Sequence, residues 1–358
     1  MDNVATTLQS VNTPAILVDL DIARRNIQRF QAYADAHGLK VRPHIKTHKL
    51  PALAEMQLRA GAVGITCQKV SEAEAMVAGS LEIRDVLITY NILGKEKLEH
   101  LAALARKVTL GVVADNETVI DGLSAAFAAE PAPLRVLVEC NTGADRCGVP
   151  TPEAAATLAQ RIAKAPGLVF GGLMTYPPAN GAAAVESFMT RAKAFLEAAG
   201  IAVPVITSGG TPSMMHAAEA PVTTEYRPGT YIYNDRSLVS RGVCGWEDCA
   251  LTVLVTVVSV PAANRAIIDA GSKALTSDLL GLTGYGHVLT RDDIAIDQLS
   301  EEHGRLVSEG PINLKVGDKL RIVPNHACVV TNMVDAVNVI EQGEIRDVWP
   351  VAARGRIV

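Results

Sequence analysis

The sequence predicts an α/β protein: a parallel (β/α)8 barrel of the TIM type, followed by a mostly antiparallel β domain. Three observations lead to this fold class. Short apolar segments alternate with helix patterns from residue 40 to residue 225. No G-x-G-x-x-G motif follows the first strand, which disfavours a doubly wound open sheet. After residue 240, β-branched runs and turns marked by Gly or Pro replace the helix patterns.

These observations divide the 358 residues into two predicted domains, each large enough for its own core. Residues 22–240 form the barrel. Residues 241–358 form the β domain. We expect the apolar N-terminal strand at residues 13–20 to join that domain, so residues 1–21 are assigned to it as well.

Within the barrel, about eight strands are expected to alternate with helices. Asp21 is positioned to cap the first helix, which Gly38 ends, and Ser71 with Glu74 has the spacing of a capping box. The predicted strands are residues 40–48, 64–67, 86–89, 108–113, 134–139, 168–174, 203–207 and 222–225. The predicted helices are residues 22–37, 51–60, 71–78, 95–106, 116–128, 152–164 and 183–199, with a short helix near Ser213.

The β domain is expected to consist of short strands joined by turns. Its predicted strands are residues 250–260, 266–269, 319–323, 327–331, 336–340 and 344–348. Residues 281–310 are predicted to form one long loop, and such loops in compact domains are more often functional than idle.

Composition excludes several classes of function. The net charge of −5 and the absence of a basic stripe argue against nucleic-acid binding. No apolar run reaches the length of a membrane span, and residues 1–10 carry no secretory signal pattern. Six scattered cysteines suit a reducing compartment better than a disulfide framework, so a cytoplasmic location is expected.

The most informative segment is R-P-H-I-K-T-H-K at residues 42–49. If it is a strand, alternation sends His44, Lys46 and His48 to one face. Apolar flanks favour burial of that face. Burial and positive neighbours both lower the pKa of a lysine and leave a neutral amine that attacks carbonyl carbon, as a Schiff-base lysine must. The alternative is a polar strand end with solvated charges.

Polar clusters follow several barrel strands, where the active residues of such barrels lie. One cluster runs from Glu139 to Gly148, and Thr175-Tyr176 follows the next strand. Residues 207–211 (T-S-G-G-T) lead into a helix, and residues 227–231 (R-P-G-T-Y) form a second glycine turn. Small residues with backbone N–H groups at a helix start form an anion site suited to phosphate.

The β domain offers one candidate metal pair. On a strand, the i, i+2 spacing puts His326 and Cys328 on one face. Imidazole and thiolate together suit zinc, and two protein ligands leave an open site for water and substrate. The alternative is a buried cysteine beside an unrelated histidine. His303 is a further candidate, although a lone histidine in a loop is more often simply solvated.

With these motifs in place, the sequence resembles the fold-type III pyridoxal-phosphate enzymes of the alanine racemase-like group. Within that group it is most similar to the D-threonine aldolase and D-serine dehydratase family. The resemblance runs along nearly the whole chain. Its motifs are TPAILVDLD (13–21), RPHIKTHK (42–49), GITCQKVSEAEA (64–75), GADRCGV (143–149), SGGTPS (208–213), PGTYIYND (228–235), DAGSK (269–273) and PNHAC (324–328).

The resemblance implies a role for each of these residues. Lys46 would hold pyridoxal 5′-phosphate as a Schiff base, with His44 and His303 as further catalytic candidates. Arg146 and Tyr176 would lie near the pyridine ring. The phosphate and the rest of the cofactor would contact Ser208, Gly209, Gly210, Gly229, Thr230 and Tyr231. The resemblance also places a divalent metal at His326 and Cys328, and it implies a homodimer with the active site at the subunit interface, where Tyr231, Tyr285 or Asp269 would serve from either subunit.

The resemblance leaves two activities open. Retro-aldol cleavage of β-hydroxy-D-amino acids to glycine and an aldehyde is preferred on overall similarity. Dehydration of D-serine or D-3-hydroxyaspartate to a 2-oxo acid and ammonia is the alternative, because the dehydratases share the His-x-Cys pair. A thiolate favours zinc, whereas the His-x-Asp pair of many aldolases favours manganese or magnesium. An amino-acid racemase and a pyridoxal-phosphate-binding protein without turnover rank below both.

Overall fold

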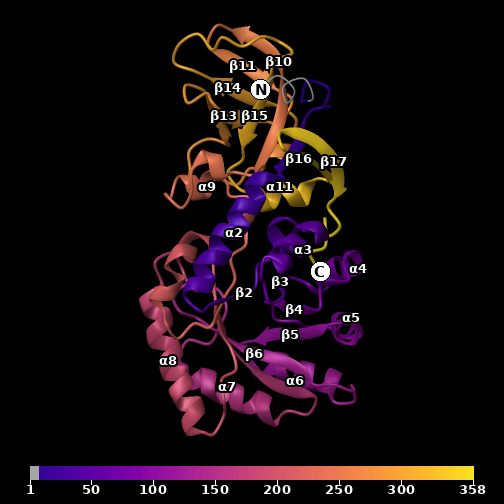
Figure 1. The fold of residues 1–358 in the computed structure, drawn as a ribbon, viewed down its shortest axis with the longest axis vertical. Helices are drawn as coiled ribbons and strands as arrows, with labels where there is room; N and C mark the ends of the chain where they lie inside the picture. Colours follow the sequence, from indigo (N-terminus) through magenta and orange to yellow (C-terminus); the bar gives the residue numbers. More distant parts are fainter. Residues whose placement is uncertain (1–7) are drawn as a thin grey trace. The chain divides into compact units, whose positions relative to one another are not determined.

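The structure is a computed structural model that describes residues 8–358 (Figure 1). The chain forms two compact units. The barrel unit contains Gln28–Lys46, Pro51–Gly229 and Arg356–Val358. The β unit contains the described part of Met1–Ile27, together with Thr47–Leu50 and Thr230–Gly355. Residues 1–7 of the segment assigned to the β domain lie outside the described residues.

The barrel unit contains eight parallel strands, which confirms the predicted parallel barrel. The order of neighbours is β2-β9-β8-β7-β6-β5-β4-β3. The ring closes because Thr66 N donates to Pro43 O (2.8 Å) and Val63 N donates to Val41 O (2.9 Å). The strands are β2 (Lys40–Val41), β3 (Ile65–Cys67), β4 (Asp85–Ile88), β5 (Thr109–Ala114), β6 (Leu134–Cys140), β7 (Leu168–Thr175), β8 (Ile206–Ser208) and β9 (Glu225–Tyr226).

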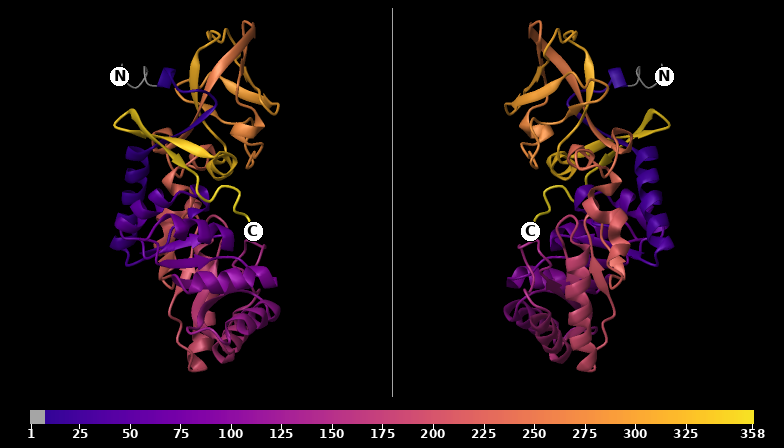
Figure 2. Two further views of the ribbon diagram at one scale, coloured as in Figure 1. Left: turned by 90° about the vertical axis from the view of Figure 1, so that its right-hand side faces the viewer. Right: turned by 90° about the vertical axis from the view of Figure 1, so that its left-hand side faces the viewer.

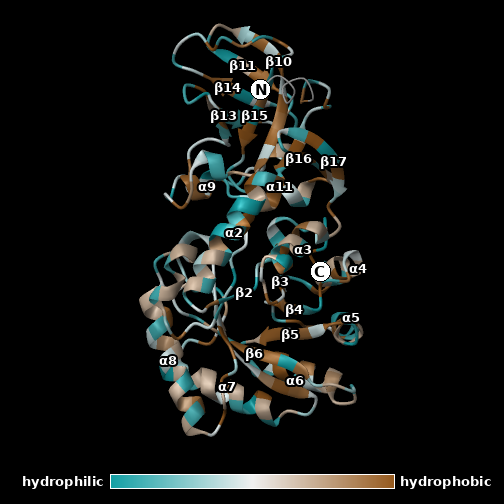
Figure 3. Ribbon diagram, viewed as in Figure 1, coloured by the Kyte–Doolittle hydropathy of each residue, from teal (hydrophilic) through white to brown (hydrophobic). Residues whose placement is uncertain are grey.

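Helices connect these strands, and α7 and α8 pack beside one another (Figure 2). The helices are α2 (Leu20–Ala36), α3 (Pro51–Arg59), α4 (Val70–Gly79), α5 (Lys95–Ala105), α6 (Glu117–Phe127), α7 (Pro152–Lys164) and α8 (Ala182–Ala198), with 3-10 turns η1 (Ile45–Thr47) and η2 (Thr211–Glu219). The central strands are the most hydrophobic part of the ribbon (Figure 3), and Val112, Val136 and Val138 are fully buried. No helix within residues 8–358 is long and apolar enough to cross a membrane.

Two predicted helix caps are wrong. Helix α2 begins at Leu20, and the carboxylate that accepts from its first free amides belongs to Asp19, not to Asp21. Helix α4 begins at Val70, so Ser71 lies inside it. Its first-turn Glu72 accepts instead from the backbone N–H of Gln68 at 2.6 Å. In both cases a carboxylate near the helix start satisfies amides that have no partner within the helix.

The β unit is mostly antiparallel, as predicted, and the N-terminal strand does join it. Strand β1 pairs antiparallel with β10 and parallel with β16. The strands are β1 (Ala15–Asp19), β10 (Leu251–Ala262), β11 (Arg265–Ile268), β12 (His287–Val288), β13 (Ala295–Leu299), β14 (Gly304–Val307), β15 (Lys319–Val323), β16 (Ala336–Glu341) and β17 (Glu344–Pro350). Its helical segments are η3 (Thr230–Ile232), α9 (Arg236–Val239), η4 (Trp246–Asp248), α10 (Ser272–Leu275) and α11 (Ala327–Met333).

Three further predictions are corrected. Residues 281–310 are not one loop, because they contain β12, β13 and β14. Residues 327–331 form helix α11 instead of a strand, since Asp235 accepts from the first helical amide, that of Ala327 (3.1 Å). The strand expected at 40–48 ends at Val41, and Ile45–Thr47 form a 3-10 turn. Tertiary hydrogen bonds overrode the local preference for strand in the second and third of these segments.

A buried arginine links three of the barrel strands. Arg42, directly after β2, donates from Nε to Glu225 on β9 (2.9 Å) and from Nη1 to Asp85 on β4 (2.7 Å). Its side chain is only 7% exposed, so the charge relies on these carboxylates in place of water.

Replacing Arg42 by alanine should leave Glu225 buried without a partner. We expect the free energy of unfolding to fall by about 3–5 kcal/mol, measured by urea denaturation of the full chain. Arg161→Ala is the matched control: its ion pair with Asp121 is exposed, so its loss should cost at most about 1 kcal/mol. Equal effects of the two variants would contradict a structural role for the buried pair.

Candidate functional site

Lys46 lies on the η1 turn, partly buried, and not on a strand face between two histidines as predicted. The turn is held by His44, whose Nε2 lies 3.0 Å from Gln68 Oε1. Gln68 donates its amide NH2 to Thr89 O (2.9 Å), so its oxygen faces the imidazole and His44 Nε2 carries the proton. His44 Nδ1 then faces the backbone N–H of Lys46 at 3.4 Å. His44 therefore orients the lysine turn.

The two glycine turns predicted to bind phosphate lie together at the carboxyl ends of β8 and β9. Arg227 N donates to Ser208 O (2.9 Å), and Gly229 N donates to Thr211 Oγ1 (3.2 Å). Position 209 must be glycine, because a Cβ there would lie 2.7 Å from the Arg227 carbonyl oxygen. The amides of Gly209 and Gly210 donate to no group among the described residues. Such amides at the start of a helical turn are suited to an anion.

Arg146 and Tyr176, both expected near the pyridine ring, lie against one another. The Arg146 guanidinium lies 4.9 Å from the Tyr176 ring centroid, a cation–π distance. A Cβ on Gly210 would lie 3.5 Å from the same ring, so Tyr176 borders the glycine turn. The structure thus brings Arg146, Tyr176 and the turn at 208–211 into one region of the barrel.

Sequence reasoning missed Arg227 as a separate element of this region. It is buried, and it donates from Nε to Thr207 Oγ1 (2.8 Å) and from Nη2 to Thr175 O. Burial lowers the pKa of Arg227 to about 10, and Glu225 and Glu139 act in the opposite direction. Arg227 is the first residue of the R-P-G-T-Y motif. An arginine before a glycine turn was not by itself a signal of a functional residue.

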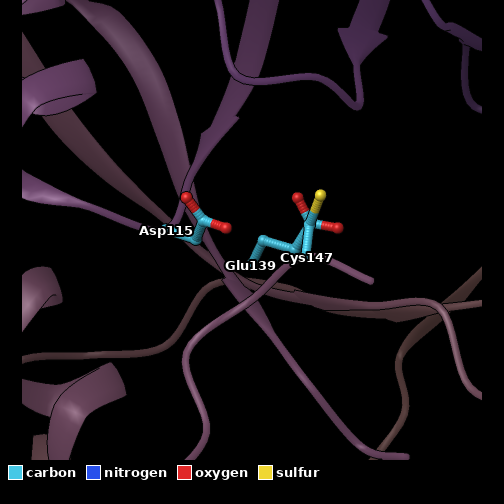
Figure 4. Close-up of side chains that lie close together, drawn as sticks. All are labelled: Asp115, Glu139 and Cys147. Atoms are coloured by element: carbon cyan, nitrogen blue, oxygen red, sulfur yellow. The ribbon is translucent and has the colours of Figure 1, made fainter. Parts of the chain in front are cut away.

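Glu139 is the penultimate residue of strand β6 and lies beside Asp115 and Cys147 (Figure 4). Burial, followed by the charge of Asp115, raises the pKa of Glu139 to about 7, although Arg146 and Arg227 oppose the shift. The carboxyl side chain forms no hydrogen bond or ion pair with any residue in the described part of the chain. Glu139 is therefore a carboxyl group that ionises near neutral pH.

In the β unit, His326 and Cys328 are brought together, although at the start of helix α11 instead of on a strand. His326 Nδ1 lies 2.8 Å from Asp278 Oδ2, and Thr47 Oγ1 lies 3.1 Å from Cys328 Sγ. Burial lowers the pKa of His326, but hydrogen bonds and charge from Cys328 and Asp278 raise it to about 9. A carboxylate on one imidazole nitrogen is the usual second partner of a metal-binding histidine, so Nε2 is the candidate donor.

Other residues of this region have mixed outcomes. Thr230, expected near the phosphate, lies with Oγ1 3.5 Å from Cys328 Sγ. Tyr231 is fully buried. Asp278 and the buried Tyr233, whose hydroxyl has no hydrogen-bond partner among the described residues, were not foreseen. Neither Asp278 nor Tyr233 belongs to a motif with a recognisable spacing, because each lies in a segment between regular elements.

The remaining candidates lie elsewhere in the β unit. His303 occupies the exposed turn between β13 and β14. Asp269 accepts from the Thr256 amide (2.8 Å) and from the Thr13 hydroxyl, so both its oxygens are occupied within the sheet. Tyr285 is partly buried and its amide donates to Ile296 O.

Known proteins of similar sequence and structure agree with this geometry. The family model of the alanine racemase N-terminal domain matches residues 18–237, and a serine dehydratase domain model matches residues 250–340. A 3-hydroxy-D-aspartate aldolase of Paracoccus denitrificans is 35% identical over 97% of this chain and 93% of its own. The crystal structure of a D-threonine aldolase from Filomicrobium marinum has a TM-score of 0.91 at 35% identity and covers 98% of both chains.

A D-threo-3-hydroxyaspartate dehydratase from Delftia sp. HT23 is also similar in structure. Its TM-score is 0.86 at 30% identity, with 96% of this chain and 98% of that chain covered. Among its variants, one replaces a histidine by alanine and another replaces a cysteine two positions later. The cysteine variant is a metal-free form.

A parallel barrel with a lysine turn and a glycine cradle, together with an antiparallel β unit, defines the alanine racemase-like class of fold-type III pyridoxal-phosphate enzymes. The chain belongs to this family, in the group that contains the D-threonine aldolases and D-serine dehydratases.

The raised pKa of Glu139 gives a pH-dependent stability. The unfolded chain loses this proton near pH 4.5 and the folded chain near pH 7, so ionisation favours unfolding as the pH rises between these values. We expect Glu139→Gln to match the wild type near pH 4.5 and to be more stable by up to about 3 kcal/mol at pH 8, measured by urea denaturation in EDTA.

Glu130→Gln is the control for the sign. The hydrogen bond from Arg106 lowers the pKa of exposed Glu130, so its replacement should not stabilise the protein as the pH rises. A pH-independent difference between wild type and Glu139→Gln would contradict the shifted titration.

Proposed function

We propose that the protein is a pyridoxal-phosphate- and divalent-metal-dependent lyase that cleaves β-hydroxy-D-amino acids to glycine and an aldehyde. The observation that supports this most strongly is the similarity of nearly the whole chain to aldolases of such substrates. The chain also carries a candidate metal pair, His326 and Cys328, with Asp278 beside the histidine. Thr47, which hydrogen-bonds Cys328, directly follows Lys46 in the chain.

The residues of the barrel fit pyridoxal phosphate. The Gly209 and Gly210 amides are open to a phosphate, and position 209 excludes any side chain. Lys46 supplies the primary amine, and Tyr176 supplies an aromatic face beside the glycine turn. When bound, this cofactor withdraws electrons from the bonds at the α-carbon of an amino acid attached to it.

The donors of the β unit fit a divalent ion. Cys328 supplies a soft sulfur ligand, which favours zinc over manganese or magnesium. Asp278 holds His326 Nδ1, which leaves Nε2 for the ion. When bound, such an ion lowers the pKa of a hydroxyl group on the substrate.

This chain's own groups decide the outcome by where they move protons. If a base takes the proton of the β-hydroxyl, the Cα–Cβ bond breaks and the aldehyde leaves. If Lys46 Nζ takes the α-proton, the hydroxyl group leaves as water, and hydrolysis of the unsaturated amine that is released gives a 2-oxo acid and ammonia. His44 acts in either case as a positioning residue, because both its ring nitrogens are engaged. Its Nε2 faces Gln68, and its Nδ1 faces the backbone N–H of Lys46.

Dehydration is the second candidate function. It is favoured by one specific observation, the His-x-Cys pair, since the similar dehydratase has variants at a histidine and a cysteine with the same spacing, the cysteine variant being in the metal-free form. The homodimer expected from the resemblance stays a prediction, and the molar mass in solution, from light scattering, decides it.

Lys46→Ala should abolish the visible absorbance that the purified protein shows with pyridoxal phosphate, because the amine that binds the cofactor is gone. Lys95→Ala is the matched control, since this lysine is exposed and lies at the start of α5. Retention of the cofactor band in Lys46→Ala would refute the assignment of the lysine.

Product analysis with D-threonine and D-3-hydroxyaspartate separates the two activities. We expect glycine and the matching aldehyde, no turnover of L-threonine, and loss of turnover in His326→Ala or after chelation, with zinc restoring the chelated wild type. A 2-oxo acid with ammonia would instead establish the dehydratase, and turnover independent of metal would remove the role of His326.

A further inference from the structure

A second set of metal donors lies in the barrel unit, apart from His326 and Cys328 in sequence and in residue type. Asp115 follows β5, Glu139 is the penultimate residue of β6, and Cys147 lies on the loop after β6. One donor atom from each of the three lies within 4.8 Å of the other two. Figure 4 shows the Glu139 carboxyl and the Cys147 sulfur side by side, with the Asp115 carboxyl turned toward them.

The backbone holds this arrangement in place. Asp115 Oδ1 accepts from the side-chain amides of Asn91 (3.0 Å) and Asn116 (2.7 Å), and Oδ2 accepts from the backbone N–H of Gly148 (2.9 Å). Gly148 has a positive φ of 104°, and a Cβ there would lie 2.5 Å from the Cys140 carbonyl carbon. The glycine therefore lets the loop return against β6 and sets Cys147 beside the carboxylates.

Glu139 is the observation that points to a ligand. Its residue is 5% exposed, and its carboxyl group has no hydrogen-bond or ion-pair partner within residues 8–358. An ionised carboxylate in such a place is unfavourable unless a positive charge or a donor meets it. Its side chain is directed at Cys147 and Asp115, where both neighbours are also donors for a cation.

The nearby arginines do not fill this role. Arg227 is committed to Thr207 and Thr175. Arg146 stacks on Tyr176 and hydrogen-bonds the Cys147 thiol, while it forms no ion pair with Glu139. Burial, followed by the charges of Glu139 and Asp115, raises the pKa of the Cys147 thiol, and Arg146 opposes that rise without satisfying the carboxyl group of Glu139.

We propose that Asp115, Glu139 and Cys147 bind a divalent first-row transition ion, zinc foremost, with a fourth position left open. The donor chemistry selects the metal: two carboxylates alone would suit magnesium or calcium, but a thiolate selects a softer ion. With all three groups ionised, a dication and the adjacent Arg146 balance their charge. The proposal stands on this donor set and does not depend on the proposed lyase activity.

Cobalt binding tests the site directly, because a thiolate on Co²⁺ gives a near-ultraviolet charge-transfer band. The experiment uses the full-length protein carrying His326→Ala and Cys328→Ala, so that the other donor pair is absent. We expect about one Co²⁺ per chain, displaced by Zn²⁺. Adding Cys147→Ser should abolish the band, and adding Glu139→Gln should weaken Co²⁺ binding at least about tenfold.

Cys244→Ser in the same background is the matched control, since Cys244 is a partly exposed cysteine of the β unit and its loss should leave the band unchanged. A second check uses the wild-type background and does not rely on the double variant. The wild type should bind two equivalents of Co²⁺ per chain, and the single variant Cys147→Ser should bind one. Absence of the band in the double variant, its persistence in Cys147→Ser, or an unchanged affinity in Glu139→Gln would each overturn the proposal.

Discussion

The barrel depends on how its ring closes between β2 and β3. These strands have only 2 and 3 residues, so they cannot hold the ring by strand pairing alone. Closure comes instead from the backbone bonds of Val63 and Thr66 to the end of β2 and the segment directly after it, and from Arg42, which reaches the carboxylates of β4 and β9. The turn that carries Lys46 begins two residues after this closure. The position of the Lys46 side chain is therefore a consequence of ring closure.

The carboxyl ends of the barrel strands concentrate charge in a region with little water. Arg227 is buried and bonded to neutral oxygens, whereas Glu139 is buried with no partner of its own. Burial disfavours an unpaired charge, so the pKa of Arg227 is lowered and the pKa of Glu139 is raised. Both shifts favour the neutral form of the side chain. Such opposed shifts in one region are typical of functional sites, and here they lie beside the glycine cradle and Arg146.

The two units contribute different chemistry. The barrel unit supplies an amine, an anion-binding turn and an aromatic face, while the β unit supplies imidazole and thiol with a carboxylate behind the imidazole. Lys46 and Thr47 are adjacent in sequence, yet one belongs to the barrel unit and the other to the β unit, where its hydroxyl contacts Cys328. One peptide bond thus links the two sets of groups.

The sequence by itself determined the alternation that forms a parallel barrel, the β-branched strands after residue 240, the glycine turns at 208–211 and 227–231, and the His-x-Cys pair. These follow from periodicity and residue type, which are local properties. Only the tertiary structure decided that Lys46 sits on a turn, that Ala327–Met333 is a helix, and that Asp278, Arg227 and Asp115 complete their clusters. Those outcomes rest on hydrogen bonds between residues far apart in the chain, such as Asp235 to Ala327, and no local pattern encodes such partners.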